Sequence, residues 1–369
     1  MKGIKTKKNR LRSRRPYRLN SHTQPTYSEN KINIITPYAV AIPTYKRPEL
    51  IAKCTLLVLY RAKIPAANIS LFLANSQERN TYVTLLQNPI NSEVKLATLL
   101  PKHMDSKNIT RYAKWLQGIN IVVGHKGLAR QRNFIRSWYP SGQNILSMDD
   151  DVRKVMRLRV SPANPKDRSK WKLIAVVKGL DELIQSGFRK AKDKGAYLWG
   201  VYPVDNAYFM SPNSSYNLKF IVGPMYGIIN RPELANHLDL DAQYDEKEDM
   251  ERTLRHWKHD GIVVRLNYVT IQTNYFDNIG GMQASLNSPF KHRKAAAEKA
   301  ALRLHNMFPN ITRIYKRTGG PRKDWAEIRL VGTRSPKHTH KNPSSYVAQN
   351  SFKLPSTVAP INKHKRDKT

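Results

Sequence analysis

The chain has 369 residues, 40% of them hydrophobic, so it can hold one large or two ordinary domains with a substantial core. Its 64 Lys and Arg against 27 Asp and Glu give a net charge of +37, which indicates a polyanionic partner, with nucleic acid the leading candidate. The single Cys54 excludes an intramolecular disulfide, and no apolar run approaches about 18 residues, so a membrane-spanning protein is not expected.

Residues 1–36 form a polar arm in which nine Lys or Arg residues precede the first acid. Like-charge repulsion and the scarcity of apolar residues predict that this arm is disordered on its own. It fits a nuclear import signal, a segment that binds phosphates or a merely solvating tail. The candidate nucleic-acid-binding residues in it are Arg12, Arg14 and Arg15.

Regular structure is expected to begin with an apolar strand at 38–42, which runs into a Pro-Thr-x-x-Arg turn and a helix opened by Pro48. A second strand at 69–75 and a second helix at 78–87 follow. Strand, helix, strand and helix at this spacing predict a parallel sheet with right-handed crossovers.

A third strand, 119–123, leads into a helix that starts at Gly127. Glycine allows the backbone to turn tightly where the helix begins. Arg132 and Asn133, one turn further on, can reach a diphosphate, and Arg130 adds positive charge beside them.

The apolar run 144–148 ends in three consecutive carboxylates, Asp149, Asp150 and Asp151. This pattern predicts a buried strand that delivers acids to the carboxyl edge of a parallel sheet, where open α/β folds bind ligands. Because side chains alternate along a strand, Asp149 and Asp151 would share a face and could bind Mg²⁺ or Mn²⁺. The alternative is a solvated strand end whose acids form Asx turns and cap the next helix.

The second half is expected to begin with a mobile basic loop, followed by further helices and strands. An acidic cluster at 245–252 opens a helix that runs through His259; simple capping competes here with a catalytic role. Gly280 and Gly281 mark a turn or a place where the backbone closes over a ligand. The predicted segments are a loop at 153–172, a helix at 171–192, strands at 196–203, 220–229 and 262–266, and an acceptor-facing or plain surface loop at 205–217.

Residues 291–369 hold 19 Lys or Arg against 4 Asp or Glu. A basic helix at 291–307 and a hairpin formed by 311–316 and 325–331 are predicted, with a disordered tail from 335. Such a helix and ribbon could contact duplex phosphates, although a solvated face competes with this interpretation. The candidate contacts are Lys316, Arg317, Arg322 and Lys323.

The order of glycine, alanine and Arg132-Asn133, then a strand ending in Asp-x-Asp, resembles the nucleotide-sugar half of GT-A-fold glycosyltransferases. With the acidic cluster added, residues 38–285 resemble the TET/JBP-associated glycosyltransferases. That family is similar to the base J glucosyltransferase, which glucosylates 5-hydroxymethylpyrimidines such as 5-hydroxymethyluracil in DNA. The segment after Lys291 lies outside the resemblance.

The resemblance implies a GT-A-like α/β fold with a mostly parallel sheet, and an inverting transfer from a UDP-sugar, UDP-glucose above all, to modified pyrimidines in double-stranded DNA. It implies that Asp149 and Asp151 hold the metal and that Asp249 is the base, with Glu248 as the alternative. The other donor-site residues it implies are Pro43, Thr44, Arg47, Gly127, Arg130, Arg132, Asn133, Asp150, Gly280 and Gly281.

The domains expected are an arm at 1–36, a catalytic domain at 37–285, a basic extension at 286–334 and a tail at 335–369. We expect an intracellular monomer, nuclear if the source is eukaryotic and in the host cytoplasm if it is viral or bacterial. A metal-dependent nuclease and a non-enzymatic DNA-packaging protein are the rival interpretations, because both also need acids or positive surface.

Overall fold

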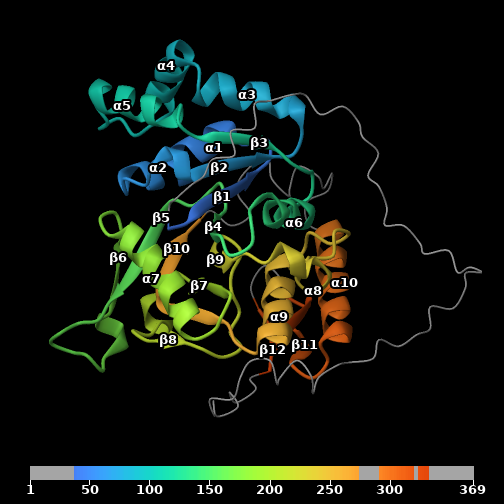
Figure 1. Ribbon diagram of the computed structural model, residues 1–369. Coiled ribbons are helices and arrows are strands. Elements are labelled where there is room, and N and C mark those ends of the chain that lie inside the picture. The colour runs from blue at the N-terminus through green and yellow to red at the C-terminus, as the bar shows by residue number, and fades with distance from the viewer. Residues whose placement is uncertain (1–36, 274–290, 320–322, 332–369) are drawn as a thin grey trace, which may run out of the picture. The chain divides into compact units, whose positions relative to one another are not determined.

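The computed structural model describes residues 37–273, 291–319 and 323–331 of the chain. A ten-stranded sheet lies at its centre (Figure 1). Its strands are β1 (Ala39–Thr44), β2 (Ile69–Leu73), β3 (Asn120–Val123), β4 (Asn144–Met148), β5 (Lys154–Arg159), β6 (Lys172–Ala175), β7 (Leu198–Tyr202), β8 (Ser214–Ser215), β9 (Met225–Ile229) and β10 (Val264–Gln272).

Helices connect most of these strands, and a small two-stranded sheet of β11 (Thr312–Lys316) and β12 (Ala326–Leu330) follows the last helix. None of the described helices is long and apolar enough to cross a membrane. The α-helices are α1 (Pro48–Lys53), α2 (Thr55–Arg61), α3 (Ser76–Leu86), α4 (Pro89–Leu99), α5 (Ser106–Leu116), α6 (Leu128–Trp138), α7 (Leu180–Asp193), α8 (Ala235–Leu238), α9 (Glu248–Asp260) and α10 (Lys291–Met307).

The strands of the large sheet follow the order β3-β2-β1-β4-β9-β7-β10-β5-β6, with β8 paired to β10. From the pairings, β1, β2, β3, β4, β6, β7 and β10 run in one direction, and β5, β8 and β9 run in the other. The mixed α/β class with a mostly parallel central sheet flanked by helices is therefore confirmed. The chain winds from β1 outward to β3 and then returns to β4 on the other side of β1, which makes the carboxyl ends of β1 and β4 a topological switch point.

β1 shows why this sheet forms at the centre. All six of its residues are buried, as expected for a parallel strand that is covered on both faces. Val40 and Ile42 join the larger hydrophobic cluster, which includes residues of α1, α2 and α7, whereas Ala39 and Ala41 join a second cluster with Ile135 of α6. Helices therefore cover both faces, and the small alanines let α6 lie close to the strand.

The loop predicted at 153–172 is wrong for residues 154–159, which form β5, and for Lys172, which begins β6; the two strands pair antiparallel at one edge of the sheet. Met156 and Leu158 of β5 are buried while Arg157 and Arg159 are exposed, so the high charge of one face concealed the strand pattern. The predicted helix at 171–192 begins nine residues later, at Leu180. Gly179 precedes it with φ of 83°, a left-handed conformation that glycine adopts without strain.

Other predicted boundaries also moved. The strand predicted at 220–229 is confirmed only as β9, and the strand predicted at 262–266 extends as β10 to Gln272. Between residues 88 and 118 the chain forms two helices, α4 and α5, where only a short helical piece was predicted. The side chain of Asp105 caps α5 by accepting a hydrogen bond from the Asn108 amide at 2.7 Å, a signal for the start of a helix.

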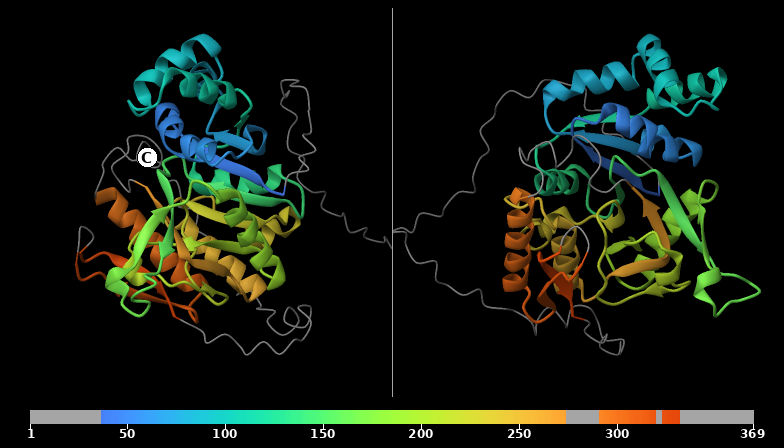
Figure 2. Two further views of the ribbon diagram at one scale, coloured as in Figure 1. Left: turned by 90° about the vertical axis from the view of Figure 1, so that its left-hand side faces the viewer. Right: turned by 180° about the vertical axis from the view of Figure 1, so that it is seen from behind.

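The predicted basic helix and hairpin near the C-terminus are confirmed as α10 and the β11–β12 pair. They pack against α9 (Figure 2) through a hydrophobic cluster that includes Leu254 of α9, Leu304 of α10 and Ile328 of β12. Arg303 of α10 also pairs with Glu251, a buried acid of α9. One face of the extension is thus used to support the helix that begins with the second acidic cluster.

Candidate active site

The three consecutive carboxylates lie in a turn at the carboxyl end of β4. The strand ends at Met148, so the alternation of side chains along a strand does not set the directions of Asp149 and Asp151 as predicted. Thr55, the first residue of α2, holds the turn: its hydroxyl donates to the Asp149 carbonyl oxygen at 2.6 Å and accepts from the Val152 amide at 2.9 Å. The backbone that carries the acids is therefore fixed on both sides.

Asp150 is the buried member of the triplet, with 4% of its surface exposed. Its carboxylate accepts hydrogen bonds from the Thr44 hydroxyl at 2.8 Å and from the Arg47 guanidinium at 2.9 Å. Burial raises the pKa of Asp150, although the Arg47 charge beside it acts in the opposite direction. Thr44, Arg47 and Asp150 thus join the loop after β1 to the turn after β4, while Pro43 is buried within β1.

Asp149 leads to the second half of the site through Arg132. The Arg132 guanidinium donates to Asp149 at 2.9 Å, and its Nε lies 3.1 Å from the Glu248 carboxylate. It also donates to the Ser147 hydroxyl at 2.8 Å and to the Tyr226 hydroxyl at 3.0 Å. Burial by itself would lower the pKa of Arg132, but Glu248 and Asp149 raise it, so the guanidinium is firmly charged. Arg132 therefore links an acid of the first half to an acid of the second.

The residues predicted to bind a diphosphate at the N-terminus of α6 make contacts with other parts of the chain. Gly127, with φ of 98°, is followed by Ala129, whose amide donates to the Asp245 carboxylate at 2.9 Å. The Asn133 side chain exchanges two 2.8 Å hydrogen bonds with the Leu240 backbone. Like the buried contacts of Arg132, these hydrogen bonds join α6 to other segments of the chain.

Arg130, by contrast, is exposed, and its Nε donates to the Ala242 carbonyl oxygen at 3.3 Å. Of the two arginines predicted as donor-site residues on α6, Arg132 is buried, whereas Arg130 has a surface that a ligand could reach.

Asp249 lies in the first turn of α9, beside the segment that precedes β9. Its carboxylate accepts hydrogen bonds from the Gly223 amide at 3.3 Å and from its neighbouring Met250 amide at 2.8 Å. The next residue, Pro224, is bonded to Asp149: its carbonyl oxygen accepts a hydrogen bond from the Asp149 backbone amide at 3.1 Å. The Asp149 backbone and the Asp249 carboxylate, 100 positions apart in the sequence, are therefore both hydrogen-bonded to the Gly223–Pro224 segment.

Glu248 occupies a different environment from Asp249. It is buried, and its carboxylate pairs with Arg132 and also with Arg252, at 2.7 Å. A Cβ atom on Gly223 would lie 3.2 Å from a Glu248 oxygen, so glycine allows the chain to approach this ion pair closely. Of the two acids predicted as the base, Glu248 is held by two cations, and Asp249 accepts only backbone hydrogen bonds among the contacts described.

The pKa of Asp249 is raised to about 6, first because the carboxyl group is removed from water and second because the negative charge of Glu248 is beside it. Arg252 and the two backbone donors limit the rise. A carboxyl group that titrates near neutral pH can accept a proton from a hydroxyl group more readily than an ordinary aspartate can.

The residues after β4 fit a divalent metal that is shared with a substrate. In the described part of the chain, no three Asp, Glu, His or Cys side chains gather closely enough to form a complete metal site. Mg²⁺, however, is commonly held by one or two carboxylates together with substrate phosphates and water. The Asp149 side chain is 29% exposed and Asp151 is partly exposed, so both can present oxygen atoms to such an ion.

Several predicted contacts lie apart from this cluster or outside the described residues. Lys316, Arg317 and Lys323 are exposed on the β11–β12 hairpin, which contributes none of the contacts described around Asp149 and Asp249. The remaining predicted residues, which fall outside the described part, are Arg12, Arg14, Arg15, Gly280, Gly281 and Arg322.

Sequence patterns missed three residues that organise the site: Thr55, Gly223 and Asp245. The Gly-Pro pair at 223–224 could have indicated a close approach of the backbone. Asp245 belongs to the acidic cluster that was expected to cap the helix following it, but its carboxylate accepts a hydrogen bond from the first turn of α6. Nothing in the local sequence distinguishes Thr55, because its importance depends on a turn almost 100 residues away.

No family of known proteins and no curated protein matches the sequence. Similar solved structures include a UDP-glucose pyrophosphorylase from Acinetobacter baumannii, with 8% identity and a TM-score of 0.37 over 64% of this chain and 87% of that one. TarS from S. aureus has 10% identity and a TM-score of 0.35, over 73% and 40% of the two chains. A mycobacterial protein has 10% identity and a TM-score of 0.38, over 80% and 83%. Likenesses this distant assign no function to the chain.

Proposed function

We propose that the chain is a metal-dependent inverting glycosyltransferase that moves a sugar, with glucose the first candidate, from a UDP-sugar to a hydroxymethylated pyrimidine in DNA. The observation that carries this proposal is that the Asp149 backbone and the Asp249 carboxylate are both hydrogen-bonded to the Gly223–Pro224 segment, beside the switch point of the sheet. The high positive charge supports a nucleic acid as the acceptor.

In the proposed reaction, the Asp249 carboxylate accepts the proton of the acceptor hydroxymethyl group. The hydroxyl oxygen forms a bond to the anomeric carbon of the sugar while the bond from that carbon to the diphosphate breaks, so the configuration inverts and the nucleoside diphosphate leaves. Mg²⁺ or Mn²⁺ at Asp149 and Asp151 would stabilise the negative charge on the departing diphosphate. Arg132 holds Asp149 in place, and Gly223 orients Asp249.

Labelled UDP-glucose, Mn²⁺ and duplex DNA with or without 5-hydroxymethyluracil test this proposal directly. We expect label on the hydroxymethylated DNA alone. Label on plain DNA would contradict the assignment, as would wild-type rates in the Asp151→Ala variant. Nicked DNA without label would identify a nuclease instead, and DNA binding with neither outcome would favour a non-enzymatic protein.

The proposed metal site can be tested in two ways, by removing the metal and by replacing Asp151. We expect chelation to abolish transfer, and Asp151→Asn to weaken Mn²⁺ binding in the presence of UDP by at least ~10- to 100-fold. Titration calorimetry measures this affinity without reference to turnover. Asp193→Asn, at an exposed site on α7, is the matched control. Unchanged Mn²⁺ affinity in Asp151→Asn would remove this residue from the metal site.

The rate should depend on pH through Asp249. Because its carboxyl group has a pKa of about 6 and must lose its proton to act as a base, kcat/KM should rise with pH below about 6 and level off above it. Initial rates in buffers of constant ionic strength give the profile. A rate that stays constant between about pH 5 and about pH 7 would contradict the role of Asp249.

A further inference from the structure

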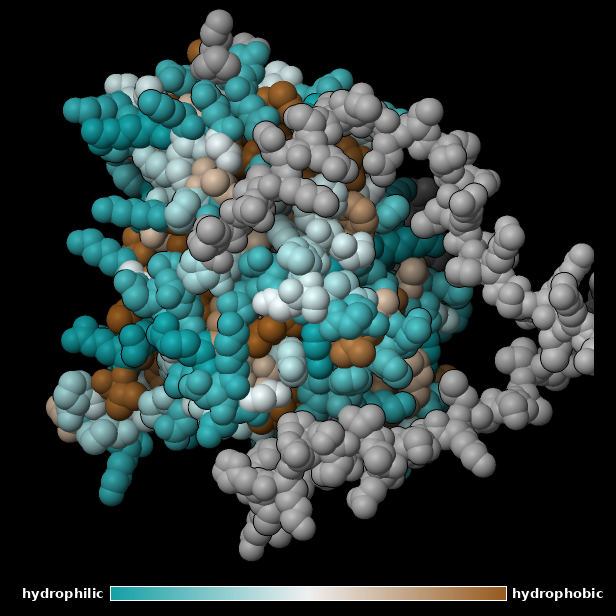
Figure 3. All heavy atoms as spheres, in the orientation of Figure 1, coloured by the Kyte–Doolittle hydropathy of each residue, from teal (hydrophilic) through white to brown (hydrophobic). Residues whose placement is uncertain are grey.

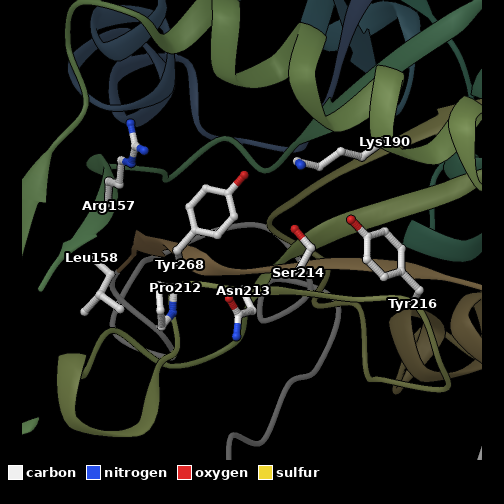
Figure 4. A pocket seen from close by; sticks show the side chains of 8 residues that line it. All are labelled: Arg157, Leu158, Lys190, Pro212, Asn213, Ser214, Tyr216 and Tyr268. Carbon is white, nitrogen blue, oxygen red and sulfur yellow. The ribbon is translucent and has the colours of Figure 1, made fainter. Parts of the chain in front are cut away.

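A cavity of about 480 Å³ lies between β5, α7, β8 and β10 (Figure 4). Its lining residues include none of those described around Asp149 and Asp249. Its volume falls within the range of roughly 300–1,000 Å³ that is typical of ligand sites. The residues that set its chemistry are Arg157, Lys190, Asn213, Ser214, Tyr216 and Tyr268. No Asp or Glu is among the described residues that line it.

The polar groups of this cavity converge. In Figure 4 the Lys190 ammonium group and the hydroxyl groups of Ser214, Tyr216 and Tyr268 point toward the same space. Neither Lys190 nor Arg157 is paired with a carboxylate within the described part of the chain. The Arg157 guanidinium instead lies 5.7 Å from the centre of the Tyr268 ring. Two cations beside two phenol rings suit a ligand that has both negative charge and a planar ring.

The wall that carries Tyr268 is irregular but well supported. The register between β10 and β7 shifts between Leu266 and Thr270, so Tyr268 lies in a bulge. The Asn267 side chain in this bulge donates to the Ser215 hydroxyl at 2.6 Å, and the backbone carbonyl oxygen of Asn267 accepts from the Ser211 amide at 3.2 Å. The loop before β8 therefore fixes the bulge that places the Tyr268 ring in the cavity.

The surface next to the cavity is basic. Residues 153–178, which contain the β5–β6 hairpin, include nine Lys or Arg and a single acid, Asp167. Figure 3 shows hydrophilic side chains projecting along the edge that carries β6 in Figure 1, with hydrophobic residues among them.

Aromatic side chains adjoin this basic surface. Tyr208 and Phe209 are 54% and 57% exposed, and Arg168 of the hairpin donates to the Tyr208 carbonyl oxygen at 3.2 Å. Cations that follow a phosphate backbone, together with rings on which bases stack, are the features by which proteins bind single nucleic-acid strands.

We infer that the cavity holds one unpaired nucleotide of a nucleic-acid strand, and that the β5–β6 hairpin binds the neighbouring phosphates. Arg157 and Lys190 supply charge to the nucleotide, and Tyr268 and Tyr216 supply ring surface. The inference deepens the proposed function and rests on it for the identity of the strand as the acceptor. It places the main nucleic-acid contact on the β5–β6 edge, and not on the β11–β12 hairpin that the sequence suggested.

Fluorescence anisotropy with a short labelled single-stranded oligonucleotide tests the inference on the full chain. We expect the double variant Arg157→Glu/Lys190→Glu to bind ~100-fold more weakly, about tenfold for each reversed charge, and to lower the salt slope by about two. Lys107→Glu/Lys114→Glu changes the net charge equally on α5, near the opposite edge of the sheet, and should lose little affinity.

The tyrosine provides a second readout with no change of charge. Tyr268→Ala should weaken binding about tenfold, whereas Tyr268→Phe keeps the ring and should bind within about twofold of wild type. Circular dichroism and thermal unfolding establish that each variant is folded. If the double reversal does not fold, Arg157→Gln and Lys190→Gln replace it.

If both double variants, on the cavity and on α5, lost the same amount of affinity for the oligonucleotide, the inference would be overturned, because net charge alone would then account for binding. Displacement of the oligonucleotide by UDP-glucose would also overturn it, since the cavity would then take a small anion. If cavity variants bind normally while the wild type transfers sugar, the inference fails and the proposed function stands. If they lose binding while the wild type transfers no sugar, the cavity assignment stands and the proposed function fails.

Discussion

Replacing Asp249 with Asn should reduce sugar transfer at least ~10³-fold, because the amide keeps the shape of the side chain but cannot accept the proton of the acceptor hydroxyl. The fold should survive, since the carboxylate is held by the backbone amides of Gly223 and Met250, and the amide oxygen of Asn can still accept a hydrogen bond there. The measurement is kcat/KM with labelled UDP-glucose and hydroxymethylated DNA.

Two further variants make this result specific. Asp193→Asn makes the same chemical change at an exposed position of α7 and should leave the rate unchanged. Glu248→Gln removes a charge that is paired with Arg132 and Arg252, so any loss of activity should be accompanied by a lower melting temperature. Asp249→Asn protein that retains more than about a tenth of wild-type activity would exclude Asp249 as the base.

The first half of the fold was predictable because its signals are local. The first five of the six buried residues of β1 form an uninterrupted apolar run, which is how a parallel strand covered on both faces appears in a sequence. The acids after β4 and at the start of α9 could likewise be found, because each directly follows an apolar run or opens a helix. The sequence therefore indicated where candidate carboxylates lie, although not what each one contacts.

The edge of the sheet was harder to predict, because β5 and β6 expose one face. Arg157 and Arg159 alternate with Met156 and Leu158, but the density of charge around them resembles a loop. Long-range pairing was equally hidden: the partner of Arg132 is Glu248, 116 positions later. A pattern can identify an arginine near the start of a helix, but only the fold determines whether it faces a phosphate or a buried carboxylate.

Arg132→Met should lower the free energy of unfolding by ~3–5 kcal/mol, the range expected when one partner of a buried ion pair is removed. Arg132 is 3% exposed, and its loss would leave Asp149 without its cation and Glu248 with Arg252 alone. Urea denaturation measures the change. Arg130→Met is the matched control: it removes an exposed arginine from the same helix and should change stability by no more than ~0.5 kcal/mol.

A double-mutant cycle separates the ion pair from the packing of the arginine stem. Arg132→Met/Glu248→Gln removes the charge from both partners, so its destabilisation should be smaller than the sum of the single effects by ~0.5–3 kcal/mol. Simple additivity would mean that the two residues act independently, and Arg132 would then not link the halves of the site energetically. A non-additive cycle would show that the two residues are coupled. If folded Arg132→Met protein also transfers sugar more slowly, the buried pair keeps Asp149 in the position that the reaction needs.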